Sequence, residues 1–353
     1  MSRGAVLEVV ALPGVPEVVA GDDVAGLLLE ALGRAGLRLE DGDCLVVSSK
    51  VVSKALGLTW AGAREDAVDA HTRRVVAERA GATGGVTRVV EAAAGPVMAA
   101  AGVDASNTGP SGAVLLLPED PDAEAARLRA ALVAGADLGA DAALAVVLSD
   151  TAGRPWRAGQ TDFALGACGL AVLDDLRGGV DHDGRALAVT ARAVADEVAA
   201  AADLVKGKAD GVPAALLRGL PTGWFAPAGA EGARSLVRTG PGDWFAVGHV
   251  EALRGALGVA AGSADSLAVG IRSVAPEPLG DRVARVVALA LHDVEDGSAD
   301  VSVGDAVAEL VLAAPDPYDV GRLVVRAQVA AASEDLVAEV VARGPASVTL
   351  RLT

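Results

Sequence analysis

Residues 143–151 read Ala-Leu-Ala-Val-Val-Leu-Ser-Asp-Thr, six apolar residues followed by three side chains that carry oxygen atoms. A continuous apolar run of this length predicts a strand that is buried on both faces. The strand would deliver Ser149, Asp150 and Thr151 at its carboxyl end. Carboxylate and hydroxyl oxygens are the ligands that Mg²⁺ or Mn²⁺ takes in a phosphate site.

A second set of oxygen donors follows the apolar residues 97–103 and includes Asp104 and Asn107. From these residue types we predict that Asp104, Asp150 and Thr151 hold a divalent metal, and that Asn107 hydrogen-bonds a nucleobase or a phosphate. The alternative for each single aspartate is a turn or a helix cap, which is a common role for an aspartate after a strand.

Positive charge recurs in segments close to these donors. The candidate phosphate-binding lysines are Lys50, Lys54, Lys206 and Lys208. Ammonium groups and loop amides neutralise phosphate oxygens, and Gly207 and Gly211 leave backbone amides accessible in the loop that begins at Lys206. Solvation is the ordinary alternative for any single lysine. Taken together, the oxygen donors and the cations indicate metal-assisted chemistry on a nucleotide.

The segment 150–162 also combines arginines, a tryptophan and glycines. Arg154 and Arg157 flank Trp156, and the nearby glycines allow a ligand to approach the backbone. This pattern suits a substrate that carries a carboxylate or a phosphate. A loop that Trp156 anchors, with its arginines bridging acidic neighbours, explains the same residues equally well.

The composition excludes several classes of protein. A net charge of −17 argues against a general nucleic-acid binder, because such proteins neutralise phosphates with clusters of Lys and Arg. We find no signal peptide and no uncharged run of roughly 18 residues, so we expect a cytoplasmic protein without a membrane partner. The two cysteines, Cys44 and Cys168, have no pairing motif and are predicted to be buried thiols. Aromatic residues make up only 2% of the chain, so an exposed aromatic side chain would be unusual.

Periodicity and turn residues predict the order of the elements. We expect strands over 7–12, 45–47, 113–117, 143–148 and 214–217, and helices over 23–35, 64–81, 121–134 and 194–205. The second helix would carry a charged face of Arg73, Arg74, Glu78 and Arg79, either solvated or in contact with phosphate. Asp181–Gly184 reads as a hairpin tip rather than a metal site.

Proline and glycine concentrate between Leu220 and Ala233, which is typical of a linker. We therefore predict a first domain over residues 1–220, a linker over 221–233 and a second, smaller α/β domain over 234–353. No Walker-type glycine loop, Gly-x-Gly-x-x-Gly, His-Glu-x-x-His or Gly-x-Ser-x-Gly motif is present, and the four histidines are scattered.

A succession of short motifs in the first domain carries a family resemblance. In chain order they are residues 12–16 (LPGVP), 21–23 (GDD), 41–43 (DGD), 49–54 (SKVVSK), 101–107 (AGVDASN), 149–157 (SDTAGRPWR), 159–162 (GQTD), 196–197 (DE) and 206–208 (KGK). Over residues 5–220 the chain resembles the coenzyme F420-0:L-glutamate ligases, which are gamma-glutamyl ligases. The resemblance implies a mixed α+β fold and a homodimer.

The activity that the resemblance implies is a GTP-dependent amide ligation of L-glutamate to coenzyme F420-0, followed by extension of the γ-glutamyl tail. The acceptor carboxylate would become an acyl phosphate, which the glutamate amine then attacks. Mg²⁺ or Mn²⁺ would act as cofactor, with K⁺ as a further cation. The implied catalytic residues are Asp150, Lys54 and Arg154, and the implied metal ligands are Asp104, Asp150 and Thr151. The implied nucleotide contacts are Val15, Pro16, Glu17, Val18, Ser49, Lys54, Asn107, Lys206, Gly207 and Lys208, with the loop 206–213 closing over the nucleotide.

Two features depart from the family pattern. Relatives usually carry a basic residue before the glycine that precedes the Asp104 loop, whereas residues 91–96 contain none. A ligase for another carboxylate acceptor, such as a folate-like pteridine, therefore stays open, as does a non-catalytic cofactor-binding or scaffold protein. Some relatives continue into a nitroreductase-like flavin domain, but residues 234–353 are short for one, and we expect a degenerate or structural module.

Overall fold

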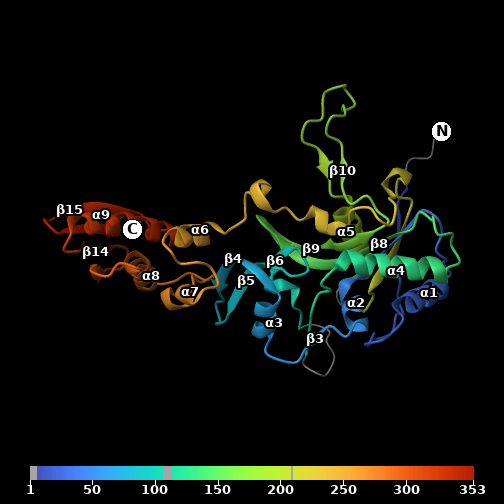
Figure 1. Ribbon diagram of the computed structural model, residues 1–353, viewed down its shortest axis with the longest axis horizontal. Helices are drawn as coiled ribbons and strands as arrows, with labels where there is room; N and C mark the ends of the chain where they lie inside the picture. Colours follow the sequence, from blue (N-terminus) through green and yellow to red (C-terminus); the bar gives the residue numbers. More distant parts are fainter. Residues whose placement is uncertain (1–5, 106–112, 208–209) are drawn as a thin grey trace. The chain divides into compact units, whose positions relative to one another are not determined.

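A computed structural model describes residues 6–105, 113–207 and 210–353 (Figure 1). The chain forms two compact units. The first comprises the chain up to Thr72 together with Ala92–Arg238, and the second comprises Arg73–Glu91 together with Thr239–Thr353. Both units combine helices with mainly antiparallel sheets, which confirms the α+β fold class. The composition-based linker over residues 221–233 stays a prediction.

A five-stranded mixed sheet forms the centre of the first unit, in the order β1-β12-β2-β8-β9. Its strands are β1 (Glu8–Ala11), β12 (Ala214–Arg218), β2 (Asp43–Ser48), β8 (Ala145–Arg154) and β9 (Arg157–Cys168). Strands β2 and β8 are parallel, and every other neighbouring pair is antiparallel. The parallel pair lies at the centre of the sheet, which agrees with the continuous apolar runs in both strands.

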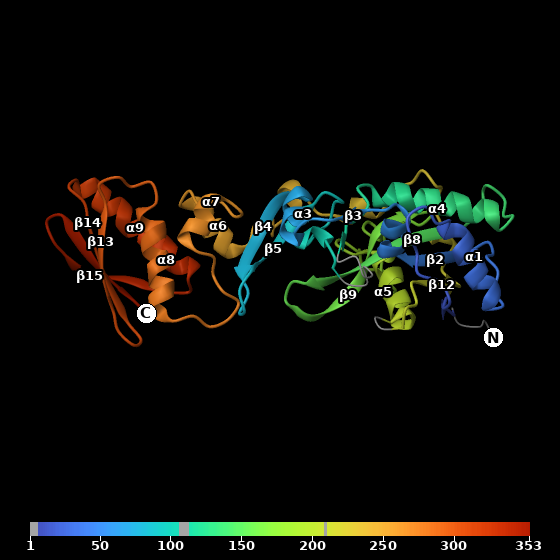
Figure 2. The same cartoon turned by 90° about the horizontal axis from the view of Figure 1, so that it is seen from below.

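Helices cover both faces of this sheet. Successive residues of a strand point to opposite faces, so Leu45 and Val47 of β2 contact one core while Cys44 and Val46 contact the other. The first core packs against α1 (Val24–Arg34) and α4 (Pro121–Gly135), and the second against α5 (Val194–Lys206). Figure 2 shows α4 and α5 on opposite sides of the strands.

Shorter elements complete the first unit. They are α2 (Ser49–Ala55), β3 (Thr59–Trp60), α3 (Arg64–Ala70), β6 (Val97–Ala99), η1 (Ala100–Gly102), β7 (Val114–Leu115), β10 (Asp174–Asp175), β11 (Ala191–Arg192), η2 (Thr222–Trp224) and η3 (Ala233–Leu236). Asp181 accepts hydrogen bonds from the backbone N–H groups of Asp183 and Arg185, which confirms the predicted hairpin tip. Cys44 and Cys168 are buried free thiols, as predicted.

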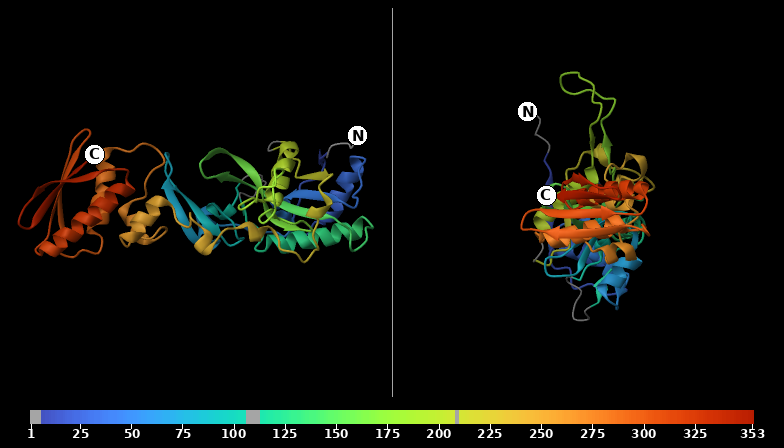
Figure 3. Two further views of the ribbon diagram at one scale, coloured as in Figure 1. Left: turned by 90° about the horizontal axis from the view of Figure 1, so that it is seen from above. Right: turned by 90° about the vertical axis from the view of Figure 1, so that its left-hand side faces the viewer.

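The second unit contains a four-stranded antiparallel sheet in the order β13-β14-β16-β15. Helices α8 and α9 supply most of the apolar side chains that pack on one face of this sheet. Figure 3 shows the two helices and the sheet in orange and red. The elements of this unit are β4 (Thr72–Ala80), β5 (Val86–Ala92), η4 (Gly240–Gly242), α6 (His249–Ala256), α7 (Ala264–Val269), α8 (Leu279–Leu291), β13 (Ser298–Val303), β14 (Ala308–Ala313), α9 (Pro317–Ser333), β15 (Ala338–Arg343) and β16 (Ser347–Leu352).

The helix predicted over residues 64–81 is confirmed for its first part, Arg64–Ala70, and wrong beyond it. Helix α3 ends at Ala70, and β4 begins at Thr72. The charged residues of this segment therefore lie on a strand, where Glu78 is buried and Arg79 forms an ion pair with the buried Glu251. The clustering of Thr72, Val75 and Val76 explains the change, because β-branched side chains favour strands.

The strand predicted over residues 143–148 is confirmed but continues further. Strand β8 runs to Arg154, so Ser149, Asp150 and Thr151 lie within the strand rather than after its end. A loop over residues 150–162, one of the two interpretations left open by the sequence, is wrong, because these residues form the hairpin of β8 and β9. Among the residues that the structure describes, no helix is long and apolar enough to cross a membrane.

Candidate functional site

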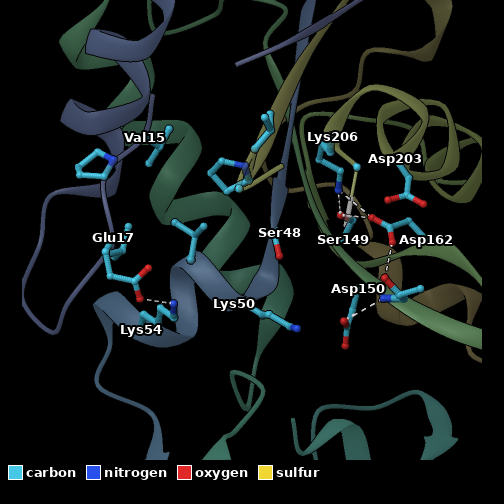
Figure 4. Close-up of a pocket in the computed structure, with 18 residues that line it drawn as sticks. Val15, Glu17, Ser48, Lys50, Lys54, Ser149, Asp150, Asp162, Asp203 and Lys206 are labelled. Atoms are coloured by element: carbon cyan, nitrogen blue, oxygen red, sulfur yellow. Dashed lines mark hydrogen bonds and ion pairs between the residues drawn. The ribbon is translucent and has the colours of Figure 1, made fainter. Parts of the chain in front are cut away.

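A cavity of about 340 Å³ opens at the edge of the sheet where the parallel strands β2 and β8 run toward their carboxyl ends. Parallel strands end at the same edge, and the register pairs Ser48 with Ser149 there. The cavity is lined by Val15, Pro16, Glu17, Val18, Ser48, Lys50, Val51, Lys54, Ser149, Asp150, Thr151, Asp162, Asp203, Lys206, Gly207, Gly211, Val212 and Pro213 (Figure 4).

Helix α2 brings two lysines to this cavity. It begins immediately after β2, and Lys50 and Lys54 are four residues apart, so they share one face of the helix. Lys54 Nζ lies 2.5 Å from Glu17 Oε1, and Lys50 forms an ion pair with Asp104. Glu17 is largely exposed, with 72% of its side chain accessible, so water weakens its hold on Lys54.

A buried hydrogen-bond network surrounds Asp162 on β9. Lys206 Nζ and Ser149 Oγ donate to Asp162 Oδ2 over 2.7 and 2.9 Å, and Thr151 Oγ1 donates to Oδ1 over 2.6 Å. Lys206 Nζ also donates to Ser149 Oγ over 2.7 Å. Burial acts to raise the pKa of Asp162, but the charge of Lys206 and these hydrogen bonds hold it below the usual value.

The pKa of Asp150 is shifted in the opposite direction, above the usual value for an aspartate. Burial raises the pKa of Asp150 to about 6, and the neighbouring charges of Asp104 and Asp162 act in the same direction. The Thr151 backbone N–H and the charge of Lys50 oppose this rise. Three carboxylates therefore act on one another at this edge of the sheet, an arrangement that a divalent cation would relieve.

The donor set fits a phosphate-bound magnesium or manganese ion. In the described part of the chain, no three His, Cys, Asp or Glu side chains converge as a ready-made metal cage. Mg²⁺ usually takes only one or two protein carboxylates and completes its shell with water and substrate phosphates. Asp104, Asp150 and the Thr151 hydroxyl supply such a partial set of hard oxygen donors.

Comparison with known proteins shows which family the chain resembles over the segment that contains this cavity. A family model described as F420-0:Gamma-glutamyl ligase matches residues 14–219. The chain belongs to the F420-0:gamma-glutamyl ligase family. The matched range includes every residue that lines the cavity.

Several curated members of this family are similar to the chain. A coenzyme F420:L-glutamate ligase of Halobacterium salinarum is 40% identical over 266 residues, which are 69% of this chain and 96% of that protein. The ligase of the same name from Methanothermobacter thermautotrophicus is 39% identical over 235 residues, 62% of this chain and 90% of the relative. The ligase of the same name from Methanopyrus kandleri is 38% identical over 249 residues, which are 65% of this chain and 93% of that relative.

Most of the site residues predicted from the sequence line the cavity of this gamma-glutamyl ligase family member. They are Val15, Pro16, Glu17, Val18, Lys54, Asp150, Thr151, Lys206 and Gly207. Asp104 is not part of the lining and joins the site through its ion pair with Lys50. Asn107 and Lys208 lie outside the residues that the structure describes.

Two predicted residues lie away from the cavity wall. Ser49 is fully buried, its hydroxyl has no hydrogen-bond partner among the described residues, and Ser48 lines the cavity instead. Arg154 lies at the exposed end of β8, four residues beyond Asp150. Trp156 does not anchor this segment as one interpretation required, because 81% of it is exposed.

Sequence reasoning assigned no role to Asp162 or Asp203. The register of the hairpin pairs Thr151 with Asp162, so a hairpin prediction would have brought Asp162 to the metal residues. Asp203 lies three residues before Lys206 on α5 and therefore on the same side of the helix. A helix prediction that ran to Lys206 would have placed Asp203 and Lys206 on one side of the helix.

Proposed function

We propose that this protein is a ligase that joins L-glutamate to the carboxylate of coenzyme F420-0 and then extends the γ-glutamyl tail, with GTP as the phosphoryl donor. One observation carries the proposal. The residues predicted to contact nucleotide and metal come from separate segments of the chain, and most of them line one cavity. The names of the relatives, coenzyme F420:L-glutamate ligases, support the choice of substrates.

The charge balance of the cavity supports a need for metal. Its lining contains three lysines, Lys50, Lys54 and Lys206, against four carboxylates, Glu17, Asp150, Asp162 and Asp203. Lys206 is already neutralised by Asp162. The described lining therefore does not carry enough positive charge to balance the negative charge of a nucleoside triphosphate. Bound cations must supply the remaining positive charge. We propose Mg²⁺ or Mn²⁺ held by Asp104, Asp150 and Thr151, with K⁺ as a further cation.

The reaction divides into two steps. The acceptor carboxylate attacks the γ-phosphorus of GTP, which forms an acyl phosphate and releases GDP. The amine of glutamate then attacks the acyl carbon, loses a proton and expels phosphate. Lys54 and Lys50 would hold phosphate oxygens, while the divalent cation would stabilise charge on the transferred group. We propose that Arg154, which lies farther along β8, contacts the acceptor.

The proposal further expects a homodimer that works in the cytoplasm. Within one subunit, the cavity already contains residues from all the predicted nucleotide-binding segments that the structure describes. We therefore expect nucleotide binding to be independent of dimerisation, which a titration at protein concentrations above and below the dimer dissociation constant measures.

The test incubates the purified full-length protein with GTP, L-glutamate, unglutamylated F420-0 and MgCl₂ or MnCl₂, and follows the products by mass spectrometry. We expect mass increments of glutamate that require both metal and GTP and are lost in Asp150→Ala. The matched control is Asp183→Ala, which removes an exposed aspartate from the remote turn at residues 181–184. Metal-dependent GTP turnover with a folate-like acceptor only would contradict the proposed substrate. No GTP turnover with any acceptor would contradict the proposed activity.

A further inference from the structure

Exposed aromatic side chains are a notable feature of a chain that has only four tryptophans, one tyrosine and three phenylalanines. Trp156, Trp244, Phe245 and Tyr318 are all more than half exposed. Trp156 is the one that shares a hairpin with Asp150 and Thr151. Large aromatic side chains on a surface are typical of binding sites, since they offer apolar area with little conformational freedom to lose.

The hairpin presents Trp156 between two arginines. Every residue from Gly153 to Gln160 is exposed, and Arg154 pairs with Arg157 across the end of the ladder. Trp156 adopts a positive φ of 59°, a conformation that costs energy for a bulky residue. Figures 2 and 3 show the two strands continuing together to this tip. The fold thus holds an aromatic ring and two guanidinium groups at the end of a regular element.

The tip is connected to the cavity by strand β8. Side chains alternate along a regular strand, so Asp150 and Ala152 lie on the same face, and Arg154 follows at the end of the strand, after an irregularity in the register. At about 3.3 Å per residue, Trp156 lies roughly 20 Å along the chain from Asp150. A substrate whose reacting carboxylate lies at Asp150 must therefore be elongated if its other end is to reach Trp156.

The names of the curated relatives contain coenzyme F420. This compound is a deazaflavin, with a fused planar ring at one end and an acidic tail at the other, so it has such a shape. We propose that the β8–β9 hairpin tip binds the ring of this anionic acceptor, with Trp156 stacked on its face and Arg154 and Arg157 adding positive charge beside it. The proposal rests on the proposed function and adds the site of acceptor recognition. In a protein with a net charge of −17, a local pair of arginines also offsets the repulsion of an anionic substrate.

The test compares Trp156→Ala with Trp156→Phe in the ligase assay. Loss of a stacking partner is expected to raise KM for the acceptor about tenfold in Trp156→Ala, while kcat and the affinity for GTP stay within twofold of the parent. Trp156→Phe retains an aromatic face and should restore most of the affinity. Trp244→Ala is the matched control, since 83% of Trp244 is exposed, against 81% of Trp156, and it lies in the second unit.

Quenching of tryptophan fluorescence by the acceptor gives a readout that does not need turnover. Addition of F420-0 should quench the parent and Trp244→Ala, and the quenched fraction should fall in Trp156→Phe. An unchanged acceptor KM in Trp156→Ala would overturn the inference, as would a change in oligomeric state that accounts for the loss, because the tip would then bind a second copy. If the parent protein shows no ligase activity but Trp156 is quenched, the proposed function fails while the binding site stands.

Discussion

At the residue scale, the buried ion pair of Lys206 with Asp162 is the main structural support of the candidate site. Both side chains are about 5% exposed or less, and Asp162 also accepts from Ser149 and Thr151. The network holds in place the hydroxyl of Thr151, a predicted metal ligand, and also Lys206, the last residue of α5. We regard Asp162 as a positioning residue, since its contacts are with side chains of the site.

Replacing Asp162 by Asn should destabilise the protein, because Lys206 would keep its charge in a buried place without a counter-ion. Breaking a buried ion pair from one side typically costs about 3–5 kcal/mol. In the double variant Asp162→Asn with Lys206→Met, we expect the free energy of unfolding, measured with urea, to return close to that of the parent. Its affinity for Mn²⁺ and nucleotide should still be weaker than that of the parent. Asp175→Asn, at an exposed ion pair, is the control. Equal stability of the single and double variants would contradict the interpretation.

Lys54 should contribute to phosphate binding more than to stability. Its partner Glu17 is mostly exposed, so the ion pair adds little to folding. Charge-assisted hydrogen bonds are worth about 1.5–3 kcal/mol, so Lys54→Met should weaken GTP binding by at least about tenfold. Titration of a fluorescent GTP analogue measures this effect, with Arg127→Met on the exposed side of α4 as the control. A GTP affinity that matches the parent would place the phosphates elsewhere.

At the element scale, the central strands could be predicted from sequence and the hairpin could not. Residues 143–148 and 45–47 are continuous apolar runs, which indicate buried strands independently of tertiary context. Residues 150–162 contain Gly153, Pro155 and Gly159, which indicate a loop, and their strand pairing is interrupted by irregular register near Leu148 and Gly153. Asp162 was therefore missed as a site residue for the same reason that the hairpin was missed.

Close packing of β9 against α4 gives a test of this element. A Cβ atom on Gly166 would lie 2.3 Å from the backbone oxygen of Pro121, whereas one on Gly33 of α1 would meet nothing within 4 Å. Gly166→Ala should thus destabilise the protein by about 2 kcal/mol or more, since backbone must move to relieve the overlap. Gly33→Ala should stabilise it by about 0.5–1 kcal/mol. Thermal and urea unfolding of both variants measure the difference, and similar values for the two would contradict the packing described.

At the scale of the whole molecule, both units bury charged side chains beside their apolar cores. In the first unit Asp162 pairs with Lys206, and in the second Glu334 pairs with Arg254 and Arg285. The sequence predicted a second α/β domain over residues 234–353, but the strand pair of β4 and β5 comes from an earlier part of the chain. Nothing local marks residues 73–91 as part of that unit, because their partners lie more than 150 residues away in sequence.

The second unit should lose stability in acid through Glu277. Burial acts to raise the pKa of Glu277, but hydrogen bonds and charge from Arg285 lower it overall. A lowered folded-state pKa contributes stability above the ordinary glutamate value, near pH 4, and this contribution is lost as the pH falls through the folded-state value. Glu277→Gln should therefore lower the melting temperature at pH 7, and this effect should shrink as the pH falls below the ordinary glutamate value. Glu309→Gln, at a more exposed pair, is the control, and a pH-independent effect of Glu277→Gln would contradict the linkage.

The strand pair of β4 and β5 has a consequence for the order in which the protein folds during synthesis. Glu78 bonds through its backbone to Glu251 and through its side chain to Ser266, and these partners follow it by 173 and 188 residues. At ribosomal rates of 5–20 residues per second, β4 is made roughly 10–35 s before Glu251 exists. Its acidic and basic side chains stay hydrated on the nascent chain for that time, so translation must reach the last third of the message before the second unit can close.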